Sequence, residues 1–219
     1  MTRMDDRPTS AMDELDPAFR GFAAACAFAV GIGGFAYSVA FVAVLRGSGE
    51  PAAASSAAFL LIGGLLATPV LVAVYLIVRP TSPGVALWAL TIGLTGAIGS
   101  AIHGGFDLAN VINEPSGSSG GFPNAVDPRG LLTFGFAAVG TAAVAWLILR
   151  GGRLPRRLGL VAAVLAALLL VIYVGRLVVL DPEHPVLLVA ALATGFVVNP
   201  LWWIRLGVAL RRADRETGQ

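Results

Sequence analysis

Six long apolar runs dominate this 219-residue sequence and leave only short polar pieces between them. About 20 predominantly apolar residues form a helix long enough to cross a hydrocarbon core of roughly 30 Å, and each run meets that length. Hydrophobic residues make up 57% of the chain and charged residues 13%, which is about half the charged share of ordinary soluble domains. The sequence therefore predicts an all-α polytopic membrane protein, a bundle of six transmembrane helices.

Turns rich in Gly and Pro set the predicted limits of the spans. The spans cover residues 19–45, 53–78, 84–111, 130–149, 158–180 and 186–210. The breakers at 47–51, 79–83, 151–155 and 181–185 are short, so consecutive helices should be antiparallel neighbours. Residues 1–18 are expected to form a mobile N-terminal tail, and residues 211–219 a C-terminal tail.

The distribution of arginine predicts the orientation of these spans. All 15 basic residues are Arg, and the side that holds both tails carries 11 of them, against Arg46 and Arg129 on the other side. Cytoplasmic loops carry an excess of basic residues, so both termini are predicted to be cytoplasmic in a multi-pass protein of the cell membrane. The 11 are Arg3, Arg7, Arg20, Arg79, Arg150, Arg153, Arg156, Arg157, Arg211, Arg212 and Arg215.

Composition also excludes several classes of function and partner. The absence of Lys excludes a retinal Schiff base, and the single Cys26 excludes an internal disulfide and a Cys-rich metal site. A formal net charge of +2, with Arg at the helix ends, argues against a nucleic-acid partner. The lipid bilayer is the partner that this composition requires.

The third run, residues 84–111, is the only one that carries both a carboxylate and an imidazole. At helical spacing, Ser100, His103, Asp107 and Asn110 fall on one stripe of the predicted helix. Ionisable side chains within a span are costly and normally face the bundle interior or a watered cavity. This stripe is therefore the candidate ligand-binding site or polar network, with Ser100 as a candidate cavity-lining residue.

Depth along the helices suggests a partner for this stripe in the fifth run. Counted at 1.5 Å per residue from the cytoplasmic ends, His103 and Arg176 lie roughly 27–29 Å up, near the outer boundary. Asp107 is the expected ion-pair partner of Arg176, and Tyr173 lies one turn before Arg176 on the same face. A structural Arg–Asp–His network, a ligand or proton site and a bound metal remain alternatives. The metal is the weakest, because zinc needs three or four ligands.

No catalytic residue, metal ligand or cofactor is predicted. A bis-imidazole haem would need His103 and His184 to face each other, whereas His184 lies between prolines in a loop. Serine proteolysis within the membrane would need a second histidine on a helix to serve as base, and the sequence offers none. The Gly- and Ser-rich connection at 112–129 is either a flexible linker or a lid over an outward pocket.

Two prolines interrupt the predicted helices near the bilayer midplane. Pro69 and Pro200 each free a carbonyl one turn back, and such breaks are either kinks or the walls of a cavity. Both helices are predicted to bend without losing the span. Asn199, next to Pro200, is a second candidate cavity-lining residue.

Four segments, IHGGFDLANVINEP, PNAVDPRGLLTFG, LPRRLGL and NPLWWIRLGVALRR, resemble a poorly characterised class of multi-pass bacterial membrane proteins of unknown function. The resemblance covers the chain from about the third span onward and implies a bacterial inner-membrane protein without an assigned activity. The leading hypothesis is binding or movement of a small molecule or ion through an outward-facing polar pocket. The alternatives are a structural or assembly subunit of a larger membrane complex and, last, a membrane enzyme, for which the chain offers few acid, base or metal-ligating groups.

Overall fold

The computed structural model describes residues 15–45, 47, 49–113, 131–179 and 184–217. Six of its helical stretches are long and apolar enough to cross a membrane, so the predicted all-α fold with six spans is confirmed. The elements are α1 (Pro17–Leu45), α2 (Glu50–Val78), α3 (Pro83–Ile112), η1 (Leu131–Phe136), α5 (Ala137–Gly151), α6 (Arg156–Val178), α7 (Pro185–Ala193), η2 (Thr194–Val198) and α8 (Asn199–Thr217).

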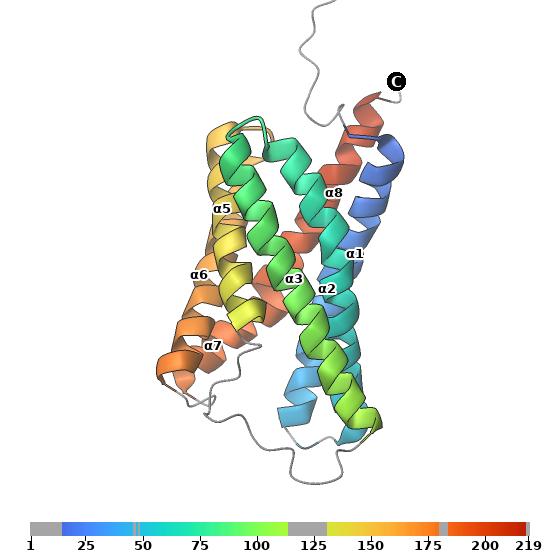
Figure 1. Ribbon diagram of the computed structural model, residues 1–219, viewed down its shortest axis with the longest axis vertical. Coiled ribbons are helices and arrows are strands. Elements are labelled where there is room, and N and C mark those ends of the chain that lie inside the picture. The colour runs from blue at the N-terminus through green and yellow to red at the C-terminus, as the bar shows by residue number, and fades with distance from the viewer. Residues whose placement is uncertain (1–14, 46, 48, 114–130, 180–183, 218–219) are drawn as a thin grey trace, which may run out of the picture.

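The spans pack in chain order and close into a ring. Helix α1 contacts α2, α2 contacts α3, α3 contacts α5, and α5 contacts α6. The sixth span closes the ring by changing partners, because α7 packs on α6 whereas α8 packs on α1 (Figure 1). The first and last spans are therefore neighbours although they are the farthest apart in sequence.

Most helices begin a few residues earlier than the sequence predicts. The prediction treated Pro51, Pro83 and Pro185 as breakers, but each lies in the first turn of a helix. Proline is tolerated there because its missing N–H would have no partner within the helix. At the start of α1, the side chain of Asp16 accepts a hydrogen bond from the Phe19 N–H at 3.1 Å, and Leu15 is buried. Residues 15–18 of the predicted tail therefore lie at the start of α1, and residues 1–14 lie outside the described part of the chain.

Close contacts through glycine hold α2 and α3 together. A Cβ added at Gly64 would lie 2.5 Å from the Ala97 carbonyl oxygen of α3. A Cβ added at Gly104 would lie 2.4 Å from the Leu61 nitrogen of α2. Small residues let backbones approach in this way, which is the ordinary packing device between membrane helices.

The main buried core lies toward one end of the bundle. We call this end, which carries the connections from α2 to α3 and from α5 to α6, the Arg-rich end, because exposed Arg79, Arg150, Arg153, Arg156, Arg157, Arg211 and Arg212 lie there. The core includes Ile77, Leu147, Ile148, Leu206 and Leu210, each at most 1% exposed. Arg20, near the start of α1, is also buried at 2% exposed, whereas His103 and Asp107 lie toward the other end of α3.

Two of the spans contain a π-helical segment. Segment η1 opens the fourth span, and η2 lies in the sixth span where it passes from α6 to α1. By contrast, α2 continues through Pro69. Such single-turn π segments are rare in proteins, and those that occur often lie at functional sites.

Segment η2 changes the hydrogen-bonding register just before Pro200. The Asn199 N–H donates to the Thr194 carbonyl, five residues back, and Pro200 has no N–H. The Gly195 carbonyl would accept from residue 199 in an α register and from residue 200 in a π register. Asn199 already donates to Thr194 and Pro200 has no N–H, so neither residue donates to the Gly195 carbonyl. The sixth span persists through this break, as predicted for Pro200.

Candidate functional site

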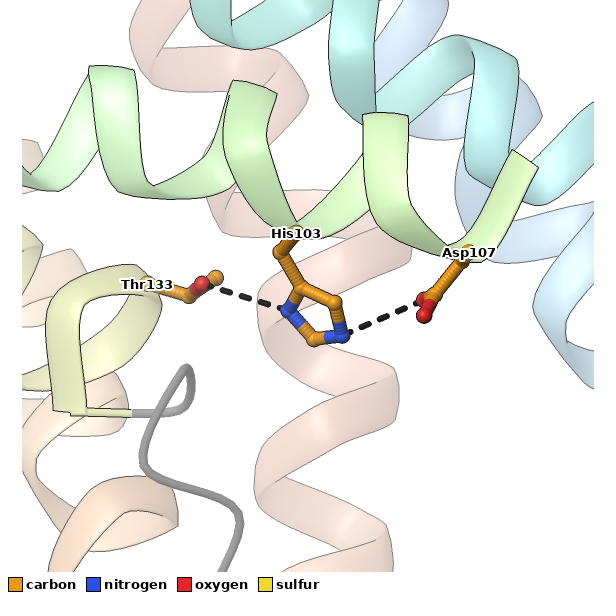
Figure 2. A network of polar contacts seen from close by, with 3 residues as sticks. All are labelled: His103, Asp107 and Thr133. Atoms are coloured by element: carbon orange, nitrogen blue, oxygen red, sulfur yellow. Dashed lines mark hydrogen bonds and ion pairs between the residues drawn. The ribbon is translucent and has the colours of Figure 1, made fainter. Parts of the chain in front are cut away.

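The candidate site is centred on two residues one turn apart on α3. The His103 Nε2 atom lies 3.2 Å from Asp107 Oδ2 (Figure 2). The side chain of His103 is 17% exposed and that of Asp107 is 40% exposed, so the pair lies partly in the interior. Spacing of four residues along a helix places side chains over each other, which is why the sequence stripe forms this contact.

Segment η1 supplies a second contact to the imidazole. Thr133 Oγ1 lies 3.5 Å from His103 Nδ1, so the ring lies between a carboxylate and a hydroxyl (Figure 2). If Nε2–H donates to Asp107, Nδ1 accepts from the Thr133 hydroxyl; after protonation both ring nitrogens donate. His103 can therefore take up a proton without losing either partner, since hydroxyl groups also accept.

The residue after Thr133 contacts the other ionisable helix. The Arg176 guanidinium of α6 lies over the ring of Phe134, with 5.7 Å between its central carbon and the ring centroid. Adjacent residues of η1 thus contact His103 of α3 and Arg176 of α6. This arrangement places His103 and Arg176 at one level of the bundle.

Helix α1 contributes Tyr37 to the site. This residue is half-buried, and the charges of Arg176 and Asp107 lie close enough to act on its phenol. We call the whole group the His103 cluster: Tyr37, His103, Asp107, Thr133, Phe134 and Arg176. Sequence reasoning missed Tyr37, Thr133 and Phe134, because an uncharged residue near the end of an apolar run resembles an interfacial or packing residue.

The structure differs from the predicted direct pairing of Asp107 with Arg176. The Asp107 carboxylate lies against His103, and the Arg176 guanidinium lies over the Phe134 ring, with no ion pair between Asp107 and Arg176 among the described residues.

The other predicted site residues occupy varied positions. Ser100 is half-buried and donates to the Gly96 carbonyl of its own helix at 3.0 Å. Asn110 and Tyr173 are half-buried, and within the described part of the chain neither side chain hydrogen-bonds to the His103 cluster. They border the cluster by position on α3 and α6.

Asn199 is engaged elsewhere, at the interface between α1 and α8. Its Oδ1 accepts a hydrogen bond from Trp203 Nε1–H at 2.9 Å, and its amide nitrogen lies 3.0 Å from where a Cβ on Gly34 would be. Nearby, the Thr194 hydroxyl is buried and has no hydrogen-bond partner among the described residues. Asn199 thus contacts its own helix and lies near α1, and its lining of a cavity stays a prediction.

In the described ranges, no group of three His, Cys, Asp or Glu side chains lies together. The His103 cluster brings one imidazole and one carboxylate into contact, and these are ligand types that zinc accepts. The acids Glu114, Asp127, Asp181 and Glu183 lie outside the described residues. So does most of the connection at 112–129, for which the sequence leaves a linker and a lid as alternatives. His184 is half-buried at the start of α7, where it lines an apolar hollow beside α6.

The chain matches no protein-family model, no curated protein and no solved structure. The case for a function therefore rests on the geometry of the His103 cluster.

Proposed function

We propose that this integral membrane protein binds, or moves across the bilayer, a small polar molecule or ion at the His103 cluster. The observation that carries the proposal is the contact of His103 with Asp107 inside an apolar span, with Arg176 at the same level. Ionisable groups at such positions are expensive, and they typically mark substrate or ion pathways and proton relays.

Packing supports a ligand at this end of the bundle. The main buried core lies toward the Arg-rich end, whereas the His103 cluster keeps an exposed carboxylate edge and an exposed guanidinium. The arginine asymmetry predicts that this end faces the outside of the membrane. The cluster would then be reached from outside, in a protein of the bacterial inner membrane, as the sequence resemblance implies.

The chemistry of the cluster favours a ligand whose binding is linked to a proton. A neutral His103 leaves Asp107 as an anion that accepts from it, whereas a protonated His103 neutralises that carboxylate. Arg176 keeps its charge in both states. Protonation therefore changes the net charge of the cluster from about zero to about +1 and raises its attraction for an anionic or zwitterionic ligand.

A ligand screen on the purified protein tests this proposal. Thermal unfolding would be measured in detergent with panels of small carboxylates, amino acids, sugars and metal ions. A ligand at 100 times its Kd adds about 2.7 kcal/mol to the free energy of unfolding. We expect at least one compound to raise the Tm of the wild-type protein and to lose most of that effect in Asp107→Asn.

A matched variant on the same helix serves as control. Thr91→Val removes an exposed hydroxyl that donates to the Leu87 carbonyl of its own helix at 3.0 Å, far from the cluster in sequence. This variant should keep the ligand response. A stabilising ligand whose effect is the same in wild type, Asp107→Asn and Thr91→Val would contradict a site at the His103 cluster, and so would a panel that stabilises nothing.

A further inference from the structure

A second charged feature, at the Arg-rich end, is not used by the His103 cluster. The turn between α5 and α6 carries Arg150, Arg153, Arg156 and Arg157 within eight residues, and all four side chains are exposed. Gly152, at φ 64°, ends α5 and reverses the chain, so the last turn of α5 and the first turn of α6 pack side by side. The fold thus gathers four guanidinium groups at one corner of the bundle.

No carboxylate of the hairpin balances this charge. The sequence has no Asp or Glu between Asp127 and Asp181, a stretch that includes the whole of α5 and α6. Within the described part of the chain, none of the four guanidinium groups forms an ion pair with an acidic side chain. Four neighbouring positive charges repel one another, so an anion bound among them would be favourable.

An aromatic ring lies against one of these guanidinium groups. The Arg150 guanidinium lies over the Trp146 ring at 5.0 Å, and this ring is 40% exposed. Tryptophan is enriched at the headgroup level, where its ring is apolar on one side and wet on the other. Exposed Leu149 and Leu160 lie next to the arginines and offer an apolar surface to an acyl chain.

We propose that the arginines of the α5–α6 turn, together with Trp146, bind the phosphate headgroup of an anionic phospholipid in the adjacent leaflet. Guanidinium groups bind phosphate oxygens through paired N–H donors, which gives geometry as well as charge. Basic clusters directly beside a span are typical of anionic-lipid recognition. A soluble anion would use the same charges but would gain nothing from Trp146 or the exposed leucines.

The test compares two double variants with equal changes in charge. The site variant is Arg150→Gln/Arg153→Gln. The control is Arg211→Gln/Arg212→Gln at the same end of the bundle, in which Arg211 also lies over an aromatic ring, that of Phe28 at 5.3 Å. Each full-length protein, purified in detergent, would be titrated with dioleoyl phosphatidylglycerol or dioleoyl phosphatidylcholine, and bound lipid would be counted by native mass spectrometry.

We expect the wild-type protein to bind the first phosphatidylglycerol more tightly than phosphatidylcholine. Each arginine removed should weaken that affinity about fivefold, so the site variant should lose about 25-fold, while the control should change little. If the site variant does not fold, Arg153→Gln alone should lose about fivefold. Equal losses in both double variants would mean a diffuse basic surface and overturn the site. Equal binding of the two lipids, or displacement of phosphatidylglycerol by millimolar inorganic phosphate, would overturn the lipid assignment.

Discussion

The contact of α2 with α3 makes a sharp prediction about Gly104. A Cβ at this position would lie 2.4 Å from the Leu61 nitrogen and 2.6 Å from the Ala57 carbonyl oxygen, where ordinary contact begins at 3.4 Å. The obstructing atoms are backbone, so no side-chain rotation relieves the clash. Gly104→Ala therefore requires α2 and α3 to separate locally by about 1 Å, and overpacking of this kind costs typically 1–3 kcal/mol.

Helix propensity acts in the opposite direction. Alanine is favoured over glycine in a helix by about 0.8–1 kcal/mol. A clash that costs about 3 kcal/mol, the top of the overpacking range, therefore lowers the free energy of unfolding by about 2 kcal/mol in total. For a chain of this size, such a loss lowers the Tm by roughly 4–8 °C. The measurement is thermal unfolding in detergent, followed by circular dichroism or light scattering.

The neighbouring residue provides the control. A Cβ at Gly105 would meet only the Leu61 Cδ1 atom, at 3.8 Å, which is ordinary contact. Gly105→Ala should therefore leave the Tm unchanged or raise it slightly. Equal shifts for the two variants, or a larger loss for Gly105→Ala, would refute the close approach of α2 and α3 at Gly104.

Two further predictions concern topology and the His103 cluster. In a cysteine-free background, a cysteine at Ser118 should react with an impermeant thiol reagent on intact cells and one at Gly152 should not; the reverse pattern would invert the orientation argued from arginine. Double-mutant cycles on thermal stability should give a larger coupling free energy for His103 with Asp107 than for Arg176 with Asp107, because the first two residues are in contact. The opposite order would support a direct Arg176–Asp107 ion pair.

Length and apolar composition were enough to predict the six spans, because a membrane leaves few alternatives to a helix of about 20 residues. The helix ends were less predictable. Pro51, Pro83 and Pro185 interrupt a helix in its interior but are accepted in its first turn, and the local sequence does not distinguish the two cases. The π-helical segments also escaped prediction, because a single extra residue in a turn leaves the apolar pattern almost unchanged.

The candidate site was predictable in part. The stripe of His103 and Asp107 follows from helical spacing within one span, and the structure forms that contact. The partner of Arg176 depends on which helices are neighbours and how each is rotated, and charge alone favoured Asp107 over the ring of Phe134. Long-range packing thus decided the part of the site that joins different helices.

A signal for Tyr37 was nevertheless present in the chain. Tyr37, His103 and Arg176 each lie 20 residues after the first residue of their helix, at Pro17, Pro83 and Arg156. The first, third and fifth spans run in the same direction, so at 1.5 Å per residue all three side chains lie about 30 Å from the Arg-rich end. A phenol, an imidazole and a guanidinium at one depth on three helices that run in the same direction therefore lie at one level of the bundle. Counting depth for every polar residue, and not only for charged ones, would therefore have added Tyr37 to the site before any packing was known.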